Sequence, residues 1–266
     1  MNDERSFSLN KIVFLTIGSL AVIALGACAQ SASSQSITGN FWLLNELNGK
    51  SLIEGTTITA QFDNAGRVAG TSGCNNYNTT YEVNGNQLTF GEPAAMTMMA
   101  CPEPIMEQER EYMNVLADTT TFDNSGDELI FKNKEGVELA RFEAVDQSLQ
   151  GTSWQALSYN NGKGGVTSLI IGTEITADFG ENNQLSGNSG CNSYFGEYKT
   201  DGDNISISGV GSTEMACLDP EGVMEQEQQY LAALETADTY KIEGLTMEMR
   251  TADGALVANF QRGGSQ

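Results

Sequence analysis

The chain has 266 residues, and its 35 acidic side chains outnumber its 13 basic ones, which leaves a formal net charge of -22. Such an acidic surface repels phosphate groups, so nucleic acids and bare anionic lipid headgroups are excluded as partners. Because the chain contains no histidine, Ser-His and Cys-His catalysis and the commonest zinc ligand are missing, and we expect no catalytic residue, no metal and no cofactor.

The first predicted element is an N-terminal export signal. Arg5 and Lys11 precede an apolar run over residues 12–24, which ends in Leu25-Gly26-Ala27-Cys28. The run is too short for a comfortable membrane span, and small residues directly before a cysteine suit the peptidase that processes lipoproteins. Residues 1–27 therefore resemble a bacterial lipoprotein signal peptide, with an ordinary signal peptide as the alternative interpretation.

This resemblance has consequences for the location of the mature chain. It implies that the chain begins at Cys28, whose acyl chains anchor it stably in a membrane. Ala29 rather than Asp follows Cys28, which resembles the outer-membrane sorting pattern of Gram-negative lipoproteins. Residues 28–36 are polar and serine-rich, as in a flexible tether. We therefore expect an outer-membrane lipoprotein that faces the periplasm.

The rest of the chain contains one domain in two copies, at residues 37–143 and 149–262. The clearest repeat is Gly-Cys-Asn-x-Tyr, at residues 73–77 and again at residues 190–194. The only two tryptophans, Trp42 and Trp154, stand at equivalent positions near the start of the copies. We expect each tryptophan to lie in the core of its own domain.

Each copy continues with strands. Residues 58–62 and 175–179 alternate between apolar and polar side chains, which is typical of a half-buried strand. In the first copy, two alternating runs around Asn84-Gly85 predict a type I′ hairpin. Residues 200–204 take the same place in the second copy.

A helix with one apolar face follows in each copy. The first helix is predicted to begin within residues 102–104 and to end near Ala117. In the second copy, Asp219 as N-cap and Pro220 at the first helical position predict a helix that ends near Glu235. Three short strands follow each helix, at residues 121–122, 129–131 and 139–142 and at residues 239–242, 245–249 and 256–260.

These elements add up to about eight strands and one helix in each copy. Short antiparallel strands with tight turns favour a strongly curved or closed sheet, with the helix over an open end or face. The predicted fold class is mainly β (α+β), with two tandem small antiparallel barrel-like sheets that each carry one helix.

Four cysteines fall into two pairs. The spacing from Cys74 to Cys101 matches that from Cys191 to Cys217 to within one residue, so equal pairing is expected. In an oxidising periplasm this pattern predicts one disulfide per domain. A redox or metal pair is the alternative, although neither pair has Cys-x-x-Cys spacing. Met96, Met98 and Met99 lie close to Cys101 in the sequence. Their thioether sulfurs could bind Cu(I), or the side chains could pack in the core.

A few polar residues are candidates for a ligand site. Asn75, Tyr77, Asn192 and Tyr194 belong to the repeated motif, where asparagine either bonds to nearby backbone or faces a ligand.

Two acidic patterns are weaker candidates. Glu107 and Glu111 stand four residues apart on a predicted helix, but Gln229 replaces the second acid in the other copy, which favours a solvated face. Residues 123–127, Asp-x-Ser-x-Asp, resemble the start of a calcium loop but lack its central glycine.

The ordered landmarks of both copies resemble the META domain family and, within it, the HslJ-like heat-shock lipoproteins. These landmarks are Trp42 or Trp154, the Gly-Cys-Asn-x-Tyr motif, the Met-Ala-Cys element at residues 99–101 or 215–217, and the acidic helix. The resemblance implies a compact barrel-like sheet with one helix and a setting in the envelope or the stress response. Related proteins are tied to novobiocin resistance and, in protozoa, to motility and secretion. No enzyme activity of the family can be carried over.

Two functions follow as hypotheses. The first is a non-enzymatic outer-membrane lipoprotein that supports envelope integrity, or stress and antibiotic tolerance, through contacts with an envelope protein. The second is a periplasmic small-molecule binding module, because small antiparallel barrels can hold an apolar ligand at their mouths.

Overall fold

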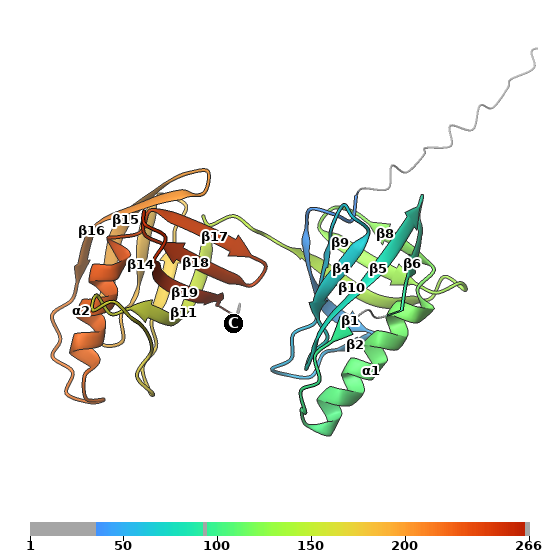
Figure 1. Ribbon diagram of the computed structural model, residues 1–266, viewed down its shortest axis with the longest axis horizontal. Helices are drawn as coiled ribbons and strands as arrows, with labels where there is room; N and C mark the ends of the chain where they lie inside the picture. Colours follow the sequence, from blue (N-terminus) through green and yellow to red (C-terminus); the bar gives the residue numbers. More distant parts are fainter. Residues whose placement is uncertain (1–35, 93–94, 264–266) are drawn as a thin grey trace, which may run out of the picture. The chain divides into compact units, whose positions relative to one another are not determined.

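The computed structural model describes residues 36–92 and 95–263 (Figure 1). Three predicted features lie outside the described residues: the signal peptide at residues 1–27, the lipidation of Cys28 and the tether up to residue 35. Within the described part of the chain, no helix is both long and apolar enough to cross a membrane. The described chain forms two sheets, and each has one helix.

Domain 1 contains the first sheet and α1. Its strands are antiparallel, and β1 pairs with both β3 and β10, so the sheet closes on itself as a ring. In the ring the order is β1-β3-β4-β5-β6-β8-β9-β10, with β2 and β7 paired to its members. The elements are β1 (Phe41–Leu47), β2 (Lys50–Ser51), β3 (Thr59–Phe62), β4 (Arg67–Thr71), β5 (Asn76–Asn84), β6 (Gln87–Phe90), β7 (Ala95–Met96), α1 (Glu103–Asp118), β8 (Thr121–Asn124), β9 (Glu128–Lys132) and β10 (Glu138–Val145).

Domain 2 repeats this arrangement with α2. Here β11 pairs with both β13 and β19, and the ring order is β11-β13-β14-β15-β16-β17-β18-β19, with β12 beside β11. The elements are β11 (Thr152–Asn160), β12 (Val166–Ser168), β13 (Thr176–Phe179), β14 (Gln184–Asn188), β15 (Ser193–Asp201), β16 (Asn204–Ser212), α2 (Val223–Leu234), β17 (Thr239–Glu243), β18 (Thr246–Arg250) and β19 (Leu256–Arg262). The predicted mainly β fold with one helix in each copy is thus confirmed. The predicted barrel-like form is confirmed in part, since one sheet is a closed barrel and the other is ring-like.

Alternating side chains fill the inside of each ring. In β9, for example, Leu129 and Phe131 are buried while their neighbours are partly exposed, because successive strand residues point to opposite faces. Trp42 and Trp154 are fully buried in the separate cores of domains 1 and 2, which confirms their predicted place. The indole Nε1 of Trp42 donates to the Ile37 carbonyl at 2.9 Å, so its one polar group is satisfied.

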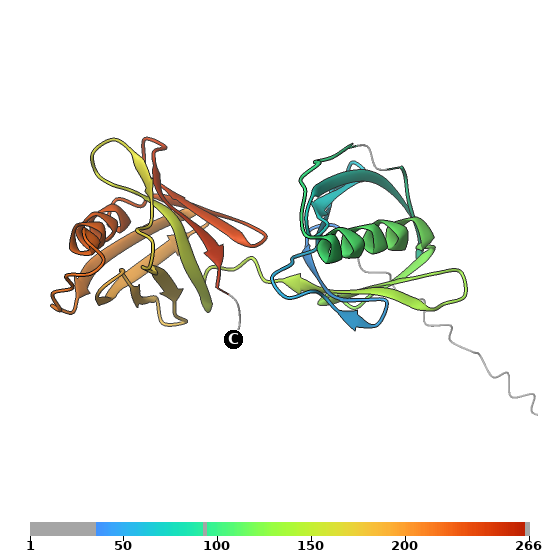
Figure 2. The same cartoon turned by 90° about the horizontal axis from the view of Figure 1, so that it is seen from below.

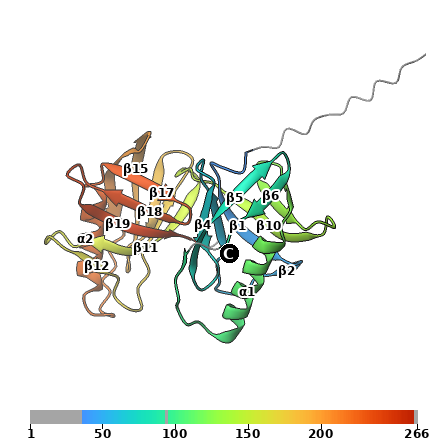
Figure 3. The same cartoon turned by 45° about the vertical axis from the view of Figure 1, so that its right-hand side comes forward.

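Each helix packs its apolar face against the sheet of its own domain (Figures 1, 2 and 3). In α1 the buried side chains include Tyr112, Val115 and Leu116, which follow helical spacing. In α2 the corresponding residues Tyr230, Ala233 and Leu234 are buried. The helices therefore bring selected polar side chains to the interior, where the repeated motif lies.

Two local predictions were wrong. The second helix begins at Val223, not at Asp219–Pro220, because Gly222 still has a left-handed φ of 88° and interrupts the helical path before it. The β5–β6 hairpin turns at Gly85–Asn86, and of these two residues only Gly85 has a positive φ, at 65°. A type I′ turn needs positive φ at both central residues, so this turn is of another type.

Candidate functional site

Two disulfides hold the repeated motif to the start of each helical segment. Cys74, in the turn between β4 and β5, is bonded to Cys101 just before α1, with their Cα atoms 6.1 Å apart. Cys191 is bonded to Cys217 in the same way, with a Cα separation of 6.0 Å. The predicted pairing is confirmed. Each bond closes a loop that contributes about 3–4 kcal/mol in the chain-entropy model.

Beside the first disulfide lies a buried polar cluster that joins three segments. Asn75 donates from its backbone N to Glu109 Oε2 at 2.8 Å and from Nδ2 to Glu109 Oε1 at 2.9 Å. Ser72 Oγ donates to Glu109 Oε2 at 2.5 Å. On its other side, Asn75 Oδ1 accepts from Thr97 Oγ1 at 2.9 Å and from the backbone N of Met99 at 2.7 Å. The asparagine thus links the motif turn, the segment before the helix and α1.

Domain 2 repeats each of these hydrogen bonds. Asn192 donates to Glu227 from its backbone N at 2.8 Å and from Nδ2 at 2.9 Å, and Ser189 Oγ donates to Glu227 at 2.6 Å. Asn192 Oδ1 accepts from Thr213 Oγ1 at 2.6 Å and from the backbone N of Met215 at 2.8 Å. Two diverged copies that keep the same cluster indicate a role that the domain itself requires.

The surroundings of the buried Glu109 carboxyl favour its ionised form. Only 5 % of Glu109 is exposed, and burial alone would raise the pKa of its carboxyl. Hydrogen bonds from Ser72 and from the side chain and backbone of Asn75 outweigh that effect and hold the pKa below its ordinary value. A carboxylate whose oxygens are occupied by fixed donors is held in place and is a poor general acid or base.

A neighbouring glutamine ties a loop to each helix. Gln108 Oε1 accepts from the backbone N of Ile53 at 2.7 Å, and its Nε2 donates to Thr56 Oγ1 at 2.8 Å. Gln226 repeats both contacts in domain 2, with Ile170 N at 2.7 Å and Thr173 Oγ1 at 3.0 Å. Gln108 and Gln226, which directly precede the buried glutamates, therefore also connect each helix to the loop beside it.

The motif tyrosines point into the cores. Tyr77 Oη donates to the Thr59 carbonyl at 3.0 Å and lies 2.7 Å from Tyr112 Oη, so it connects β5 to β3 and to α1. Burial raises the pKa of Tyr77, which stays protonated and able to donate. In domain 2, Tyr194 makes the equivalent bonds to the Thr176 carbonyl at 2.8 Å and to Tyr230 at 3.0 Å.

Sequence reasoning missed the partners of the motif. It singled out Glu107, which is exposed, and Glu111, which is half-buried and accepts from Asn48 Nδ2 at 2.7 Å. The buried partner is Glu109. Its signal was present in the sequence, because both copies read Ser-Gly-Cys-Asn and then Glu-Gln-Glu on the helix, at residues 107–109 and 225–227.

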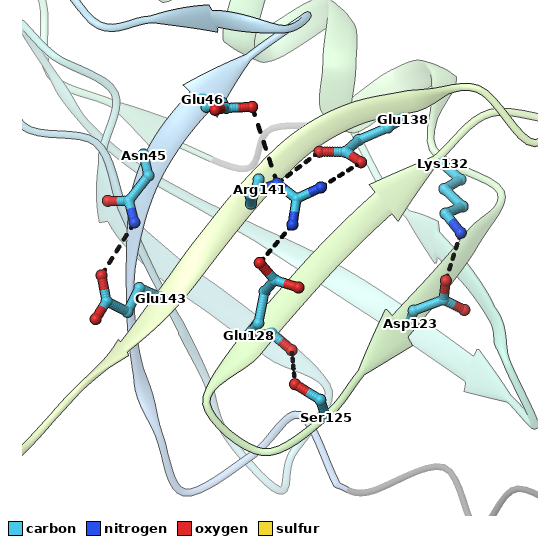
Figure 4. Close-up of polar contacts among 9 residues, drawn as sticks. All are labelled: Asn45, Glu46, Asp123, Ser125, Glu128, Lys132, Glu138, Arg141 and Glu143. Atoms are coloured by element: carbon cyan, nitrogen blue, oxygen red, sulfur yellow. Dashed lines mark hydrogen bonds and ion pairs between the residues drawn. The ribbon is translucent and has the colours of Figure 1, made fainter.

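The calcium-like segment of domain 1 forms the β8–β9 hairpin. Asp123 pairs with Lys132 across this hairpin, so its carboxylate already faces a cation (Figure 4). Beside it, Arg141 Nη2 lies 2.7 Å from Glu138, and the guanidinium also pairs with Glu128. These hydrogen bonds, first that to Glu128, raise the pKa of Arg141. The figure shows a surface ion-pair network that joins β9 and β10.

The methionine cluster of domain 1 is divided by burial. Met96 packs against the core, whereas Met98 and Met99 are exposed, and the Cys101 sulfur is committed to a disulfide. The cysteine therefore offers no thiolate to a soft metal. In the described part of the chain, no group of three or more histidine, cysteine or acidic side chains is placed to hold a metal ion.

Shallow hollows lie on the outer surface of the domains. One of about 580 Å³ on domain 1 lies over β3, β4, β5 and β7 and includes the side chains of Gln61, Asn76 and Asn78. One of about 530 Å³ on domain 2 lies between α2 and the loop at residues 160–163. Both are open to solvent. Tyr77 of the motif contributes to the lining of the first, but neither contains the motif asparagines.

Comparison with known proteins places both halves in one family. A family model described as the META domain matches residues 35–146 and again residues 147–264. No curated protein matches the chain.

Several solved structures resemble part of the chain. An NMR structure of a protein from Burkholderia xenovorans has 27% identity and a TM-score of 0.38, covering 44% of this chain and 85% of that one. A second NMR structure has 16% identity and a TM-score of 0.33, covering 39% and 87%. A crystal structure of a DUF4847 family protein from Bacteroides vulgatus has 13% identity and a TM-score of 0.27, covering 34% and 61%.

Proposed function

We propose that this chain, which belongs to the META domain family with two tandem copies of the domain, is a non-enzymatic lipoprotein of the outer membrane. It is anchored through Cys28, faces the periplasm and supports envelope integrity, or tolerance of stress and antibiotics, through contacts with another envelope protein. An HslJ-like role in the heat-shock response belongs to the same proposal.

The observation that carries this proposal is the internal use of the repeated motif. Both amide atoms of Asn75 and of Asn192 are hydrogen-bonded to the protein itself, and Tyr77 and Tyr194 are buried. In an enzyme or a dedicated receptor, the polar groups kept in both copies would converge on an open site. Here they hold the helix to the sheet, which leaves the outer surface to make the functional contacts.

The disulfides and the charge support the location. Disulfides persist in oxidising compartments such as the periplasm. A net charge of -22 keeps a tethered domain soluble and away from anionic headgroups. Cys28 lies outside the described residues, so the anchor rests on the sequence pattern at residues 25–28.

The test is cross-linking in intact cells of the organism that makes the protein, combined with deletion of the gene. We expect deletion to raise sensitivity to envelope stress or antibiotics, and cross-linking to capture a specific envelope protein. Unchanged sensitivity together with the absence of any captured partner would overturn the proposal. Restoring the parent chain should restore tolerance, whereas a chain secreted without Cys28 should not.

A small-molecule binding module is the alternative proposal. The buried Trp42 and Trp154 belong to the packed cores of the two rings, which counts against an apolar ligand inside either ring. The outer hollow of about 580 Å³ on domain 1, with the amides of Gln61, Asn76 and Asn78, is the site that this alternative requires. A ligand whose binding is abolished by Asn78→Ala would favour it over the proposal above.

A further inference from the structure

Exposed apolar side chains gather at the disulfide end of each domain. Of the twelve large apolar side chains that are exposed in the described residues, seven stand at these two ends. In domain 2 they are Ile171, Met215, Leu218 and Met224, which stand on segments joined by hydrogen bonds and which we name the apolar cap. Ile171 is 96 % and Leu218 is 92 % exposed, which is unusual for aliphatic side chains.

The backbone under the apolar cap is fixed by hydrogen bonds. The backbone N of Met215 donates to Asn192 Oδ1 at 2.8 Å, and that of Ile170, next to Ile171, donates to Gln226 at 2.7 Å. Leu218 follows Cys217, whose sulfur is in the disulfide and whose backbone N donates to Met224 Sδ at 3.4 Å. These hydrogen bonds and the disulfide therefore hold the backbone that carries the cap side chains in place.

The segment that carries Met215, Leu218 and Met224 of the cap is acidic. Residues 213–225 contain four carboxylates and no lysine or arginine. Glu214, Asp219 and Glu221 are exposed, and among the described residues no cation lies within ion-pair distance of them. The fourth, Glu225, pairs with Lys163 at 2.7 Å. We name Glu214, Asp219 and Glu221 the acidic group. Exposed apolar side chains that alternate along the chain with such carboxylates are complementary to an apolar face flanked by positive charges.

From this complementarity we propose that the apolar cap of domain 2 binds a basic amphipathic segment of a partner protein. Apolar side chains of the partner lie on the methionines, which adapt to many shapes, and its lysines or arginines face the acidic group. The proposal rests on the proposed function, since it names the surface through which protein contacts are made. A second copy of this cap would meet it with like charge, and anionic lipid would be repelled.

Domain 1 carries a weaker version of the same surface. Ile53, Met98 and Met99 are exposed beside the first disulfide, so the apolar part is repeated. However, Glu103 is already paired with Arg110 at 2.9 Å, which reduces the free negative charge. Domain 2 is therefore expected to bind the partner more tightly than domain 1.

The experiment measures binding of a labelled synthetic helix of leucine and lysine to the full mature chain by fluorescence anisotropy. A peptide with the same composition in scrambled order is the control for simple charge attraction. Leu218→Ser should weaken binding by about tenfold, since burial of that side chain is lost. Leu157→Asn, at an exposed position of β11, is the matched control and should leave the affinity unchanged.

The acidic group is tested in the same assay. Combined Glu214→Gln and Glu221→Gln should weaken binding at low salt and reduce its salt dependence, whereas Glu181→Gln, in the turn before β14, should not. Equal binding of the scrambled peptide, or equal affinity of the Leu218→Ser and Leu157→Asn chains, would overturn the proposal. So would Leu218-dependent binding to zwitterionic phosphatidylcholine vesicles without binding to the peptide.

Failure of this proposal can be told apart from failure of the proposed function. A photo-cross-linking residue is placed at position 218 or at position 157 in intact cells. Capture of the same partner at 218 and not at 157 is the expected result. If cross-linking of the whole chain captures an envelope partner while position 218 does not, the apolar cap is the wrong surface and the proposed function stands.

Discussion

Glu109 lies inside domain 1 with donors from Ser72 and Asn75 on its carboxylate oxygens. Glu109→Gln replaces one of the two accepting carboxylate oxygens with an NH2 group, which is a donor. That NH2 group would face the donors of Ser72 or Asn75. A buried donor without an acceptor costs about 1–3 kcal/mol, so the free energy of unfolding of domain 1 should fall by that amount. Urea denaturation followed by circular dichroism measures it.

The matched control is Glu107→Gln, two residues earlier on the exposed face of α1. It should change the free energy of unfolding by less than about 0.5 kcal/mol. In domain 2, Glu227→Gln should reproduce the effect of Glu109→Gln, because its cluster has the same bonds. Equal stability of the Glu107→Gln and Glu109→Gln chains would show that the cluster contributes nothing.

Acid should weaken domain 1 through the same residue. The pKa of Glu109 is below its ordinary value of 4.5 in the folded state, so the unfolded chain binds this proton more readily. The stabilisation is therefore complete above pH 4.5 and is lost as the pH falls through the lower folded-state pKa. The stability gap between the parent and Glu109→Gln should narrow below pH 4.5 in thermal melts, and a constant gap would contradict this assignment.

Only part of this cluster could be predicted from the sequence. The repeated Gly-Cys-Asn-x-Tyr motif identified Asn75 and Asn192, because identical residues in two diverged copies stand out. It did not identify Glu109 or Glu227, since each lies more than 30 positions from its asparagine and only folding brings them together.

At the scale of the elements, each disulfide holds the segment before a helix to the sheet. Removal of the first one by combined Cys74→Ser and Cys101→Ser should lower the free energy of unfolding of domain 1 by about 3–4 kcal/mol. Thermal unfolding with and without a reductant measures it. The reductant should destabilise both domains of the parent but only domain 2 of the double variant. A parent whose melting temperature is insensitive to the reductant would refute the expected contribution.

The two rings have an equivalent weak seam. β6 and β8 share one residue pair in register, Gln87 with Thr121, and β16 and β17 also share one, Asn204 with Thr239. The chain leaves the ring at this point to form the helix, so few ladder hydrogen bonds cross the seam. In native-state hydrogen exchange, the amides of Leu88 and Ile205, which bond across it, should exchange before those of β9 and β18. Earlier exchange in β9 or β18 would contradict this order.

The strands were largely predictable, and the helix starts were less so. Alternating burial is a local property, which is why residues 58–62 and 129–131 were recognised as strands. The start of α2 depends on Gly222, whose left-handed conformation is compatible with both a turn and a cap, so the pattern favoured Asp219 instead.

At the scale of the whole molecule, Cys28 is expected to determine where the chain resides. In the proposed lipoprotein, Cys28→Ser would remove the site of acylation and should release the chain from the membrane into the soluble periplasmic fraction. Fractionation of cells followed by immunoblotting measures this, with Ser31→Ala as a control that should stay in the membrane. A Cys28→Ser chain that remained membrane-bound would show that another feature provides the anchor.

The sequence by itself determined the properties that depend on composition and on repetition. The charge of -22, the absence of histidine, the two copies and the two cysteine pairs are all visible without coordinates. Alternation of side chains was enough to predict a mainly β fold, because burial in a strand repeats every second residue.

Only the tertiary structure decided what the repeated motif does. Closure of β1 on β10 and of β11 on β19 joins the ends of each domain, and the helices then carry Glu109 and Glu227 to the asparagines. Such contacts join positions far apart in the chain, so they produce no periodic pattern in the local sequence from which they could be predicted. The same folding turned the motif inward and placed Leu218 and Ile171 outward, which moved the candidate surface from the motif to the apolar cap.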